Sequence, residues 1–80
     1  MTILSSRRQL ILERRRIGRN LHNARKKQNL TLKNLSEKIN VRTDLLDRYE
    51  IGKNQIGIEM VARIAKSLDV TLRDVLLSDV

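Results

Sequence analysis

The apolar residues of this chain recur at intervals of three and four, the spacing that places them on one face of an α-helix. No stretch alternates apolar and polar residues as a half-buried strand would. Short polar interruptions divide the helical pattern into five segments, at about residues 7–28, 32–39, 43–50, 57–68 and 72–77. The pattern therefore predicts an all-α fold of five helices around an aliphatic core.

Residues at the predicted helix ends support this division. Thr31 and Thr71 stand where N-caps are expected, and Asp74, three residues after Thr71, completes an approximate capping box. Asn40 and Asp69 follow the second and fourth segments, and both side chains tolerate left-handed backbone better than most non-glycine residues. We therefore expect short connections, with a tight turn at Asn40 between the second and third helices.

The first segment allows two interpretations. Gly18 lies within it and costs about 1 kcal/mol relative to alanine in a helix interior. The segment is therefore either one long helix, capped by Ser5 or Ser6, or a basic arm followed by a helix that begins near residue 16. On either interpretation the chain divides into a basic arm or helix extension at 1–16 and a domain at 17–77.

Composition narrows the class of protein. The chain has 80 residues with no Cys and one His, so we expect no disulfide, no metal site and no cofactor. It has no Gly-rich phosphate loop and no obvious pair of nucleophile and base, so the sequence does not predict an enzyme. Apolar runs are too short to cross a bilayer, and no signal peptide is visible. These features predict a cytoplasmic protein with no evident small-molecule ligand.

The positive charge is concentrated in the first part of the chain. The net charge is +8, and residues 1–30 hold nine basic residues against one acidic residue, whereas residues 31–80 hold eight of each. A concentrated positive field suits nucleic acid or an anionic membrane surface, although solubility alone is the alternative. Membrane binding requires aromatic or bulky apolar anchors, and the chain has one Tyr and no Trp or Phe. Nucleic acid is therefore the favoured partner.

Four segments of residues 17–76 occur in a characteristic order: IGRNLHNARKKQNLT, LKNLSEKINV, RYEIGKNQ and VARIAKSLDVTLRDVL. Together they resemble the phage repressor/Cro family, the xenobiotic-response-element type of helix-turn-helix. The resemblance implies a five-helix, lambda-repressor-like domain that binds double-stranded DNA. It also implies a transcriptional regulator, most often a repressor, which acts as a homodimer and places its helix at 42–49 in the major groove.

The resemblance further implies which residues read bases. They are the outward positions of the helix at 42–49, namely Arg42, Thr43, Asp44, Leu45, Asp47 and Arg48. Among them Arg48 can donate two hydrogen bonds to guanine, and Asp44 can accept one from cytosine. Because Asp44 and Arg48 are four residues apart, they could instead pair with each other on the helix surface.

Phosphate contacts are expected from basic and polar residues around that helix, namely Lys33, Lys53, Asn54, Gln55 and the arginines Arg14, Arg15 and Arg16. Two positions depart from the family, because Leu32 stands where Gln is frequent and Ile51 where a polar or basic residue is frequent. The arginines of residues 1–16 could compensate by lying along the duplex or in the minor groove. A solvated tail and a helix packed on a second subunit are the alternatives.

Two further expectations concern structure and partners. The resemblance implies an ion pair between Arg25 and Glu50 that orients the third helix. The C-terminal segment is rich in apolar residues that could form a dimer contact or close the monomer core: Leu72, Val75, Leu76, Leu77 and Val80. Two acidic residues on the reading helix leave a second function open, a protein-interaction or antitoxin-type module with the same fold.

Overall fold

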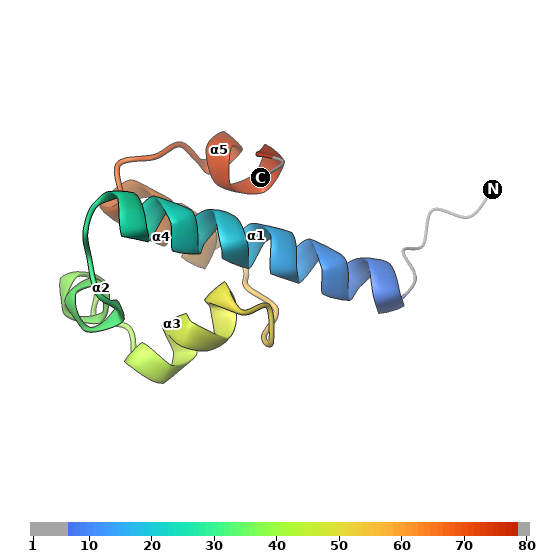
Figure 1. Cartoon of the computed structure of the whole chain (residues 1–80), viewed down its shortest axis with the longest axis horizontal. Helices are drawn as coiled ribbons and strands as arrows, with labels where there is room; N and C mark the ends of the chain where they lie inside the picture. The colour runs from blue at the N-terminus through green and yellow to red at the C-terminus, as the bar shows by residue number, and fades with distance from the viewer. Residues whose placement is uncertain (1–6, 79–80) are drawn as a thin grey trace.

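The computed structural model describes residues 7–78, which form five helices and no strand (Figure 1). The predicted all-α fold is therefore confirmed, and each helix begins and ends within about one residue of its expected bounds. The helices are α1 (Arg7–Lys27), α2 (Leu32–Ile39), α3 (Thr43–Glu50), α4 (Ile58–Ser67) and α5 (Leu72–Leu77). The expected caps at Ser5 and Ser6 lie outside the described residues.

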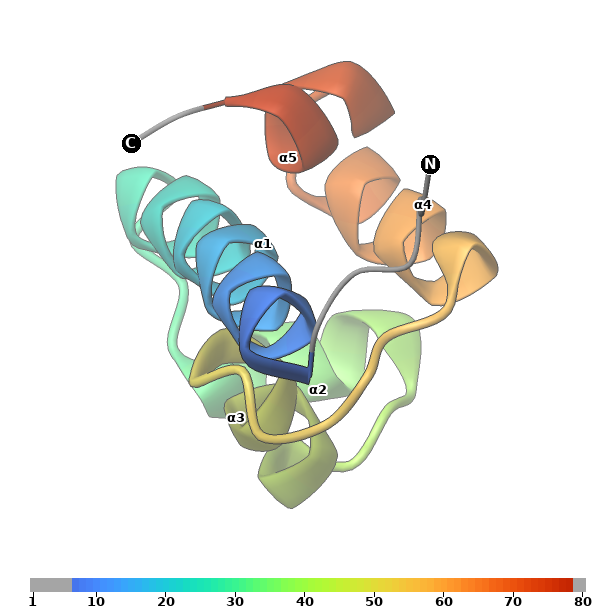
Figure 2. The same ribbon diagram turned by 90° about the vertical axis from the view of Figure 1, so that its right-hand side faces the viewer.

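The long α1 is the element around which the others are arranged. It packs against α3 on one side and α5 on the other, while α4 packs against α2 and α5 (Figure 2). Ten buried apolar residues form one cluster in the middle, to which every helix contributes: Leu21, Leu35, Ile39, Val41, Leu46, Val61, Ile64, Ala65, Leu68 and Val75. The core is aliphatic, as the composition requires.

The connections contain the predicted caps. Thr31 and Thr71 both form capping boxes, with Asn34 and Asp74 as their partners. The backbone N–H of Thr71 donates to the Asp74 carboxylate, and this hydrogen bond lowers the pKa of Asp74. Left-handed backbone follows α1, α2 and α4 without a glycine, at Asn29, Asn40 and Asp69 (φ 57°, 57° and 59°).

Gly18 lies inside α1 without interrupting it, because a close approach to another helix requires a residue with no side chain there. A Cβ atom at Gly18 would lie 2.3 Å from the backbone oxygen of Tyr49 and 2.5 Å from that of Glu50. The backbone of α1 therefore rests directly on the last turn of α3. This contact holds the end of α3 against α1.

The opposite flank of α1 is joined to α5. Asn20 donates through Nδ2 to the backbone oxygens of Val75 (2.7 Å) and Ser78 (2.9 Å). Val75 is buried and Leu72 and Leu76 are half-buried against the core, whereas Leu77 is exposed; Val80 lies outside the described residues. Most of the C-terminal apolar residues thus close the monomer core.

Candidate nucleic-acid interface

The turn between α2 and α3 sets α3 along one edge of the molecule (Figure 1). Leu46 is buried and Tyr49 is half-buried against the core, so the inward face of α3 is fixed by packing. The opposite face is open to solvent and carries five of the six side chains expected to read bases: Arg42, Thr43, Asp44, Asp47 and Arg48.

Leu45 does not lie on the open face of α3, where it was expected. It is half-buried and packs against the core, so its side chain is not freely offered to a ligand. Residues one apart on a helix differ by about 100° in direction, and Leu45 lies on the same flank of the buried Leu46 as Tyr49 does. The apolar stripe of α3 is therefore wider than the sequence analysis assumed.

The charges on the exposed face of α3 are paired differently from the expected alternative. Arg42 donates through Nη2 to Asp44 Oδ2 at 3.1 Å, and both side chains are exposed. Arg42 provides no side-chain cap for α3. Within residues 7–78, the Arg48 side chain forms no hydrogen bond or ion pair, so its guanidinium group is available to an incoming ligand.

The residues expected to contact phosphate are spread over three elements. Lys33 is exposed at the start of α2, and the loop after α3 carries Lys53 and Gln55, both exposed, with Asn54 half-buried. Arg14 lines a hollow with Gln55 and Ile56, which places the N-terminal half of α1 beside this loop. Each of these groups except Asn54 and Arg14 extends well into solvent.

Arg16 is placed on another side of the molecule. Its Nη1 atom donates to the backbone oxygen of Ser78 at 3.1 Å, and its Nη2 atom pairs with Glu13 at 2.8 Å. Helix periodicity explains this, because Arg16 is four residues before Asn20, which also binds the end of α5. The structure therefore does not bring Arg16 together with Lys53 and α3, unlike the position expected for a phosphate contact beside α3.

Arg25 and Glu50 join α1 to the last residue of α3. Arg25 donates through Nε to Glu50 Oε2 at 2.7 Å and through Nη2 to Oε1 at 2.9 Å, and each side chain is only 7% exposed. The hydrogen bonds to Glu50 raise the pKa of Arg25, despite the opposing effect of burial. Arg25 also donates through Nη1 to the backbone oxygen of Leu30 at 2.6 Å. This geometry fixes the orientation of α3 relative to α1.

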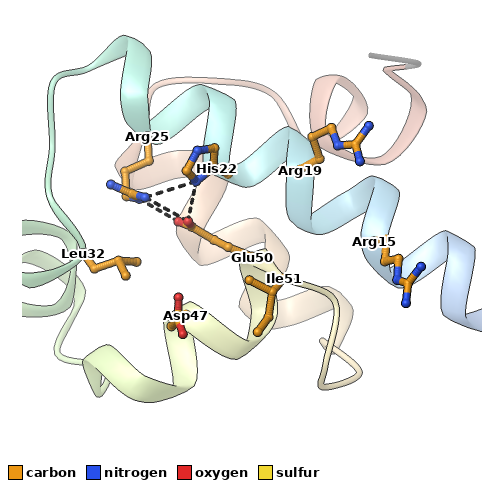
Figure 3. A pocket seen from close by; sticks show the side chains of 8 residues that line it. All are labelled: Arg15, Arg19, His22, Arg25, Leu32, Asp47, Glu50 and Ile51. Carbon is orange, nitrogen blue, oxygen red and sulfur yellow. Dashed lines mark hydrogen bonds and ion pairs between the residues drawn. The ribbon is translucent and has the colours of Figure 1, made fainter.

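His22 extends this pair into a cluster of three side chains (Figure 3). Its Nδ1 atom lies 2.9 Å from Glu50 Oε1 and 3.2 Å from Arg25 Nη2, and its ring is half-exposed. From the sequence, His22 is expected to be a surface residue of the first helix or, alternatively, a phosphate contact; its pairing with Glu50 was not predicted. Its position three residues before Arg25 on one helix face was the signal that could have found it.

A hollow of about 350 Å³ opens beside this cluster, between α1, the start of α2 and α3 (Figure 3). Leu32, Asp47, Glu50 and Ile51 line it from α2 and from α3 and its following turn. The remaining lining residues all come from α1, and all can carry positive charge: Arg15, Arg19, His22 and Arg25. The α1 side of the hollow is therefore the side that can attract an anion.

Two helices at a tight turn, the second with one face buried and the other open, define the helix-turn-helix class of proteins. In this class the second helix enters the major groove of DNA. The described residues 7–78 contain no helix long and apolar enough to cross a membrane. The same part of the chain has no group of three or more metal-ligating His, Asp or Glu side chains.

Comparison with known proteins identifies the family. The family model for the helix-turn-helix of the HTH_3 type matches residues 21–75, which is more than half of the chain. The chain belongs to this family, and the resemblance to the Cro type of helix-turn-helix is confirmed. A search of curated proteins found no match.

Two solved structures share the fold. The clp gene regulator ClgR from C. glutamicum is 28% identical with a TM-score of 0.77, and the match covers 80% of this chain and 82% of that one. An HTH_3 family transcriptional regulator from Vibrio cholerae is 23% identical with a TM-score of 0.79; the match covers 88% of this chain but 39% of that one. Family and fold together make the chain a DNA-binding protein of the transcription-regulator class.

Proposed function

We propose that this protein is a sequence-specific repressor that binds double-stranded DNA as a homodimer, with α3 in the major groove. The observation that carries the proposal is the state of α3. Its inward face is fixed by the buried Leu46 and by the Arg25–Glu50 pair. The Arg48 side chain, which has no partner among residues 7–78, projects from its open face. A rigid helix with a free guanidinium group is suited to read a base edge.

Base reading would depend on three side chains of the open face. Arg48 would donate to O6 and N7 of a guanine, and Thr43 would contact bases from the first turn of α3. Asp44 would accept from a cytosine only after its contact with Arg42 is given up. We therefore assign most of the sequence discrimination to Arg48.

Phosphate contacts would fix the position of α3 along the DNA duplex. Lys33 at the start of α2 and Lys53 after α3 lie in segments that flank α3 along the chain, and both are exposed. Asn54 and Gln55 belong to the same loop as Lys53, and Arg14 of α1 lies beside this loop; these three would add weaker contacts. Such contacts supply affinity for any sequence and depend on salt concentration.

Dimerisation would let the protein bind two half-sites on the DNA. One eight-residue helix reads only a few base pairs, and a two-fold symmetric pair doubles that number. Leu77 (66% exposed) and Ile58 (57% exposed) are apolar side chains left uncovered on the α4 and α5 side, which supports a contact between subunits there. Selection of bound sites from random duplexes tests this point, because a homodimer selects two inverted half-sites about one DNA turn apart.

Replacing Arg48 with alanine tests base reading. We expect the Arg48→Ala variant to lose discrimination at one base pair by about 1–3 kcal/mol, while its binding to unrelated duplexes changes little. Competition binding between the selected site and a site altered at each guanine measures this. If the variant keeps the wild-type preference at every position, Arg48 does not read a base.

Replacing Lys53 with alanine tests the phosphate contacts. We expect Lys53→Ala to weaken binding to all duplexes by a similar factor and to reduce the slope of log K against log salt by about 0.9. A salt titration of binding, with Lys66→Ala on α4 as the matched loss of one exposed charge, gives both values. If neither Arg48→Ala nor Lys53→Ala alters DNA binding, the acidic open face of α3 points instead to a protein-interaction or antitoxin-type module.

A further inference from the structure

The outer flank of α1 carries a row of cations that continues beyond the matched family segment. Arg8, Arg15, Arg19 and Lys26 are spaced by seven, four and seven residues, so on a helix they point within roughly 40° of one another. All four are exposed and, within the described structure, none of their side chains forms a hydrogen bond or an ion pair. We call these four residues the α1 cation row; it extends over about 27 Å.

The middle of the α1 cation row lies beside the end of α3. Gly52, directly after α3 in a left-handed turn (φ 77°), has no side chain, and a Cβ atom there would lie 2.9 Å from Arg15 Cα. Arg15 and Arg19 both line the hollow that also exposes Ile51 (Figure 3). These two arginines are therefore held at the border of the surface that α3 presents.

The residues that line the hollow favour a negatively charged group that is part of a longer molecule. Leu32 and Ile51 form apolar walls that offer no polar atom, although they can contact the methylene stems of arginine. Glu50 is already neutralised by Arg25, which leaves Asp47 as the one carboxylate opposing Arg15 and Arg19. The local balance is positive, and arginine binds phosphate through two parallel hydrogen bonds.

From this arrangement we infer that α1 is a second DNA-contacting helix, whose Arg15 and Arg19 bind backbone phosphates beside the groove that α3 occupies. The inference rests on the proposed function and specifies it further. The apolar residues at positions 32 and 51 offer no phosphate ligand themselves, and α1 supplies two arginines beside them from outside the two-helix unit. Arg8 and Lys26 extend the same row toward neighbouring phosphates.

The test compares the double variant Arg15→Ala/Arg19→Ala with Lys27→Ala/Arg73→Ala. The control removes the same charge from exposed residues on α1 and α5 that lie outside the hollow. Binding to one duplex of about 20 base pairs is measured by fluorescence anisotropy over a salt series. We expect the first variant to reduce the salt slope by about 1.8 and the affinity at 0.1 M salt by roughly 60-fold, at unchanged base preference.

Two further measurements complete the design. Arg15→Lys/Arg19→Lys retains both charges and should retain most of the wild-type salt slope, and circular dichroism shows that each variant is folded. If the wild-type chain binds no duplex, the proposed function fails and this inference fails with it. If the wild-type chain binds duplex but the alanine variant follows the Lys27→Ala/Arg73→Ala control, the inference alone is overturned.

Discussion

Replacing Arg25 with leucine is expected to lower the free energy of unfolding by about 3–5 kcal/mol, a large part of the stability of a domain this small. Removal of the guanidinium group leaves the carboxylate of Glu50, which is 7% exposed, without its main partner. It also leaves the backbone oxygen of Leu30 without its donor. His22 keeps its existing contact with Glu50 Oε1 but replaces neither of the hydrogen bonds that Arg25 donated.

Urea unfolding followed by circular dichroism measures this loss. The Arg25→Leu/Glu50→Leu variant is the informative companion, because it removes the stranded charge and fills the site with apolar groups. We expect it to recover at least half of the lost stability, with the Leu30 oxygen accounting for the remainder. A single variant as stable as the wild type would mean that the pair contributes nothing to the fold.

Replacing Gly18 with alanine is the second change with a large expected effect. In a helix interior, alanine is more favourable than glycine by about 1 kcal/mol. If position 18 faced solvent, the Gly18→Ala variant would therefore be more stable than the wild type. In this structure the new methyl group would overlap the backbone oxygens of Tyr49 and Glu50, and backbone atoms cannot rotate away. Overpacking of this kind costs about 1–3 kcal/mol, and we expect a net loss of stability.

Gly57→Ala is the matched control for this substitution. The control adds the same methyl group at a position where nothing lies within 4 Å, and the backbone there (φ −74°) suits alanine. Thermal unfolding should therefore show a lower Tm for Gly18→Ala and little change for Gly57→Ala. An increase in Tm for Gly18→Ala would show that α1 does not rest on α3 as described.

The local parts of the fold could be predicted from the sequence because their causes are local. Thr31 and Thr71 specify helix starts through their own side chains, and Asn40 and Asp69 specify helix ends through backbone tolerance. These causes lie within a few residues of the structure that they produce. They mark the starts of α2 and α5 and the ends of α2 and α4.

The expectations that needed correction depend on contacts between residues far apart in the chain. Leu45 is half-buried because the core covers a wider stripe of α3 than its own periodicity indicates. Arg16 donates a hydrogen bond to the backbone oxygen of Ser78 at the end of α5. The two residues are sixty-two positions apart, so no local sequence pattern predicts this contact. The need for glycine at position 18 could likewise not be predicted. Glycine is unfavourable within a helix, and only the close approach of the α3 backbone explains its presence there.

The base-reading and phosphate assignments depend on both the family resemblance and the structure. The resemblance supplied the positions, and the structure supplied their exposure and pairing, which separate Arg48 from Asp44. Arg19 was not among the expected phosphate ligands, because it lies within the family segment and not in the arginine run that precedes it. Its relation to Arg15 emerges only from the path of α1 past the turn after α3.

The uninterrupted course of α1 has a mechanical consequence. One flank of this helix holds α3 through Gly18 and Arg25, and the other holds α5 through Asn20. Close packing transmits displacements rather than absorbing them. A molecule that tilted α5 would therefore also tilt α3, the helix that we propose enters the major groove. Binding at the C-terminal side would then change DNA affinity.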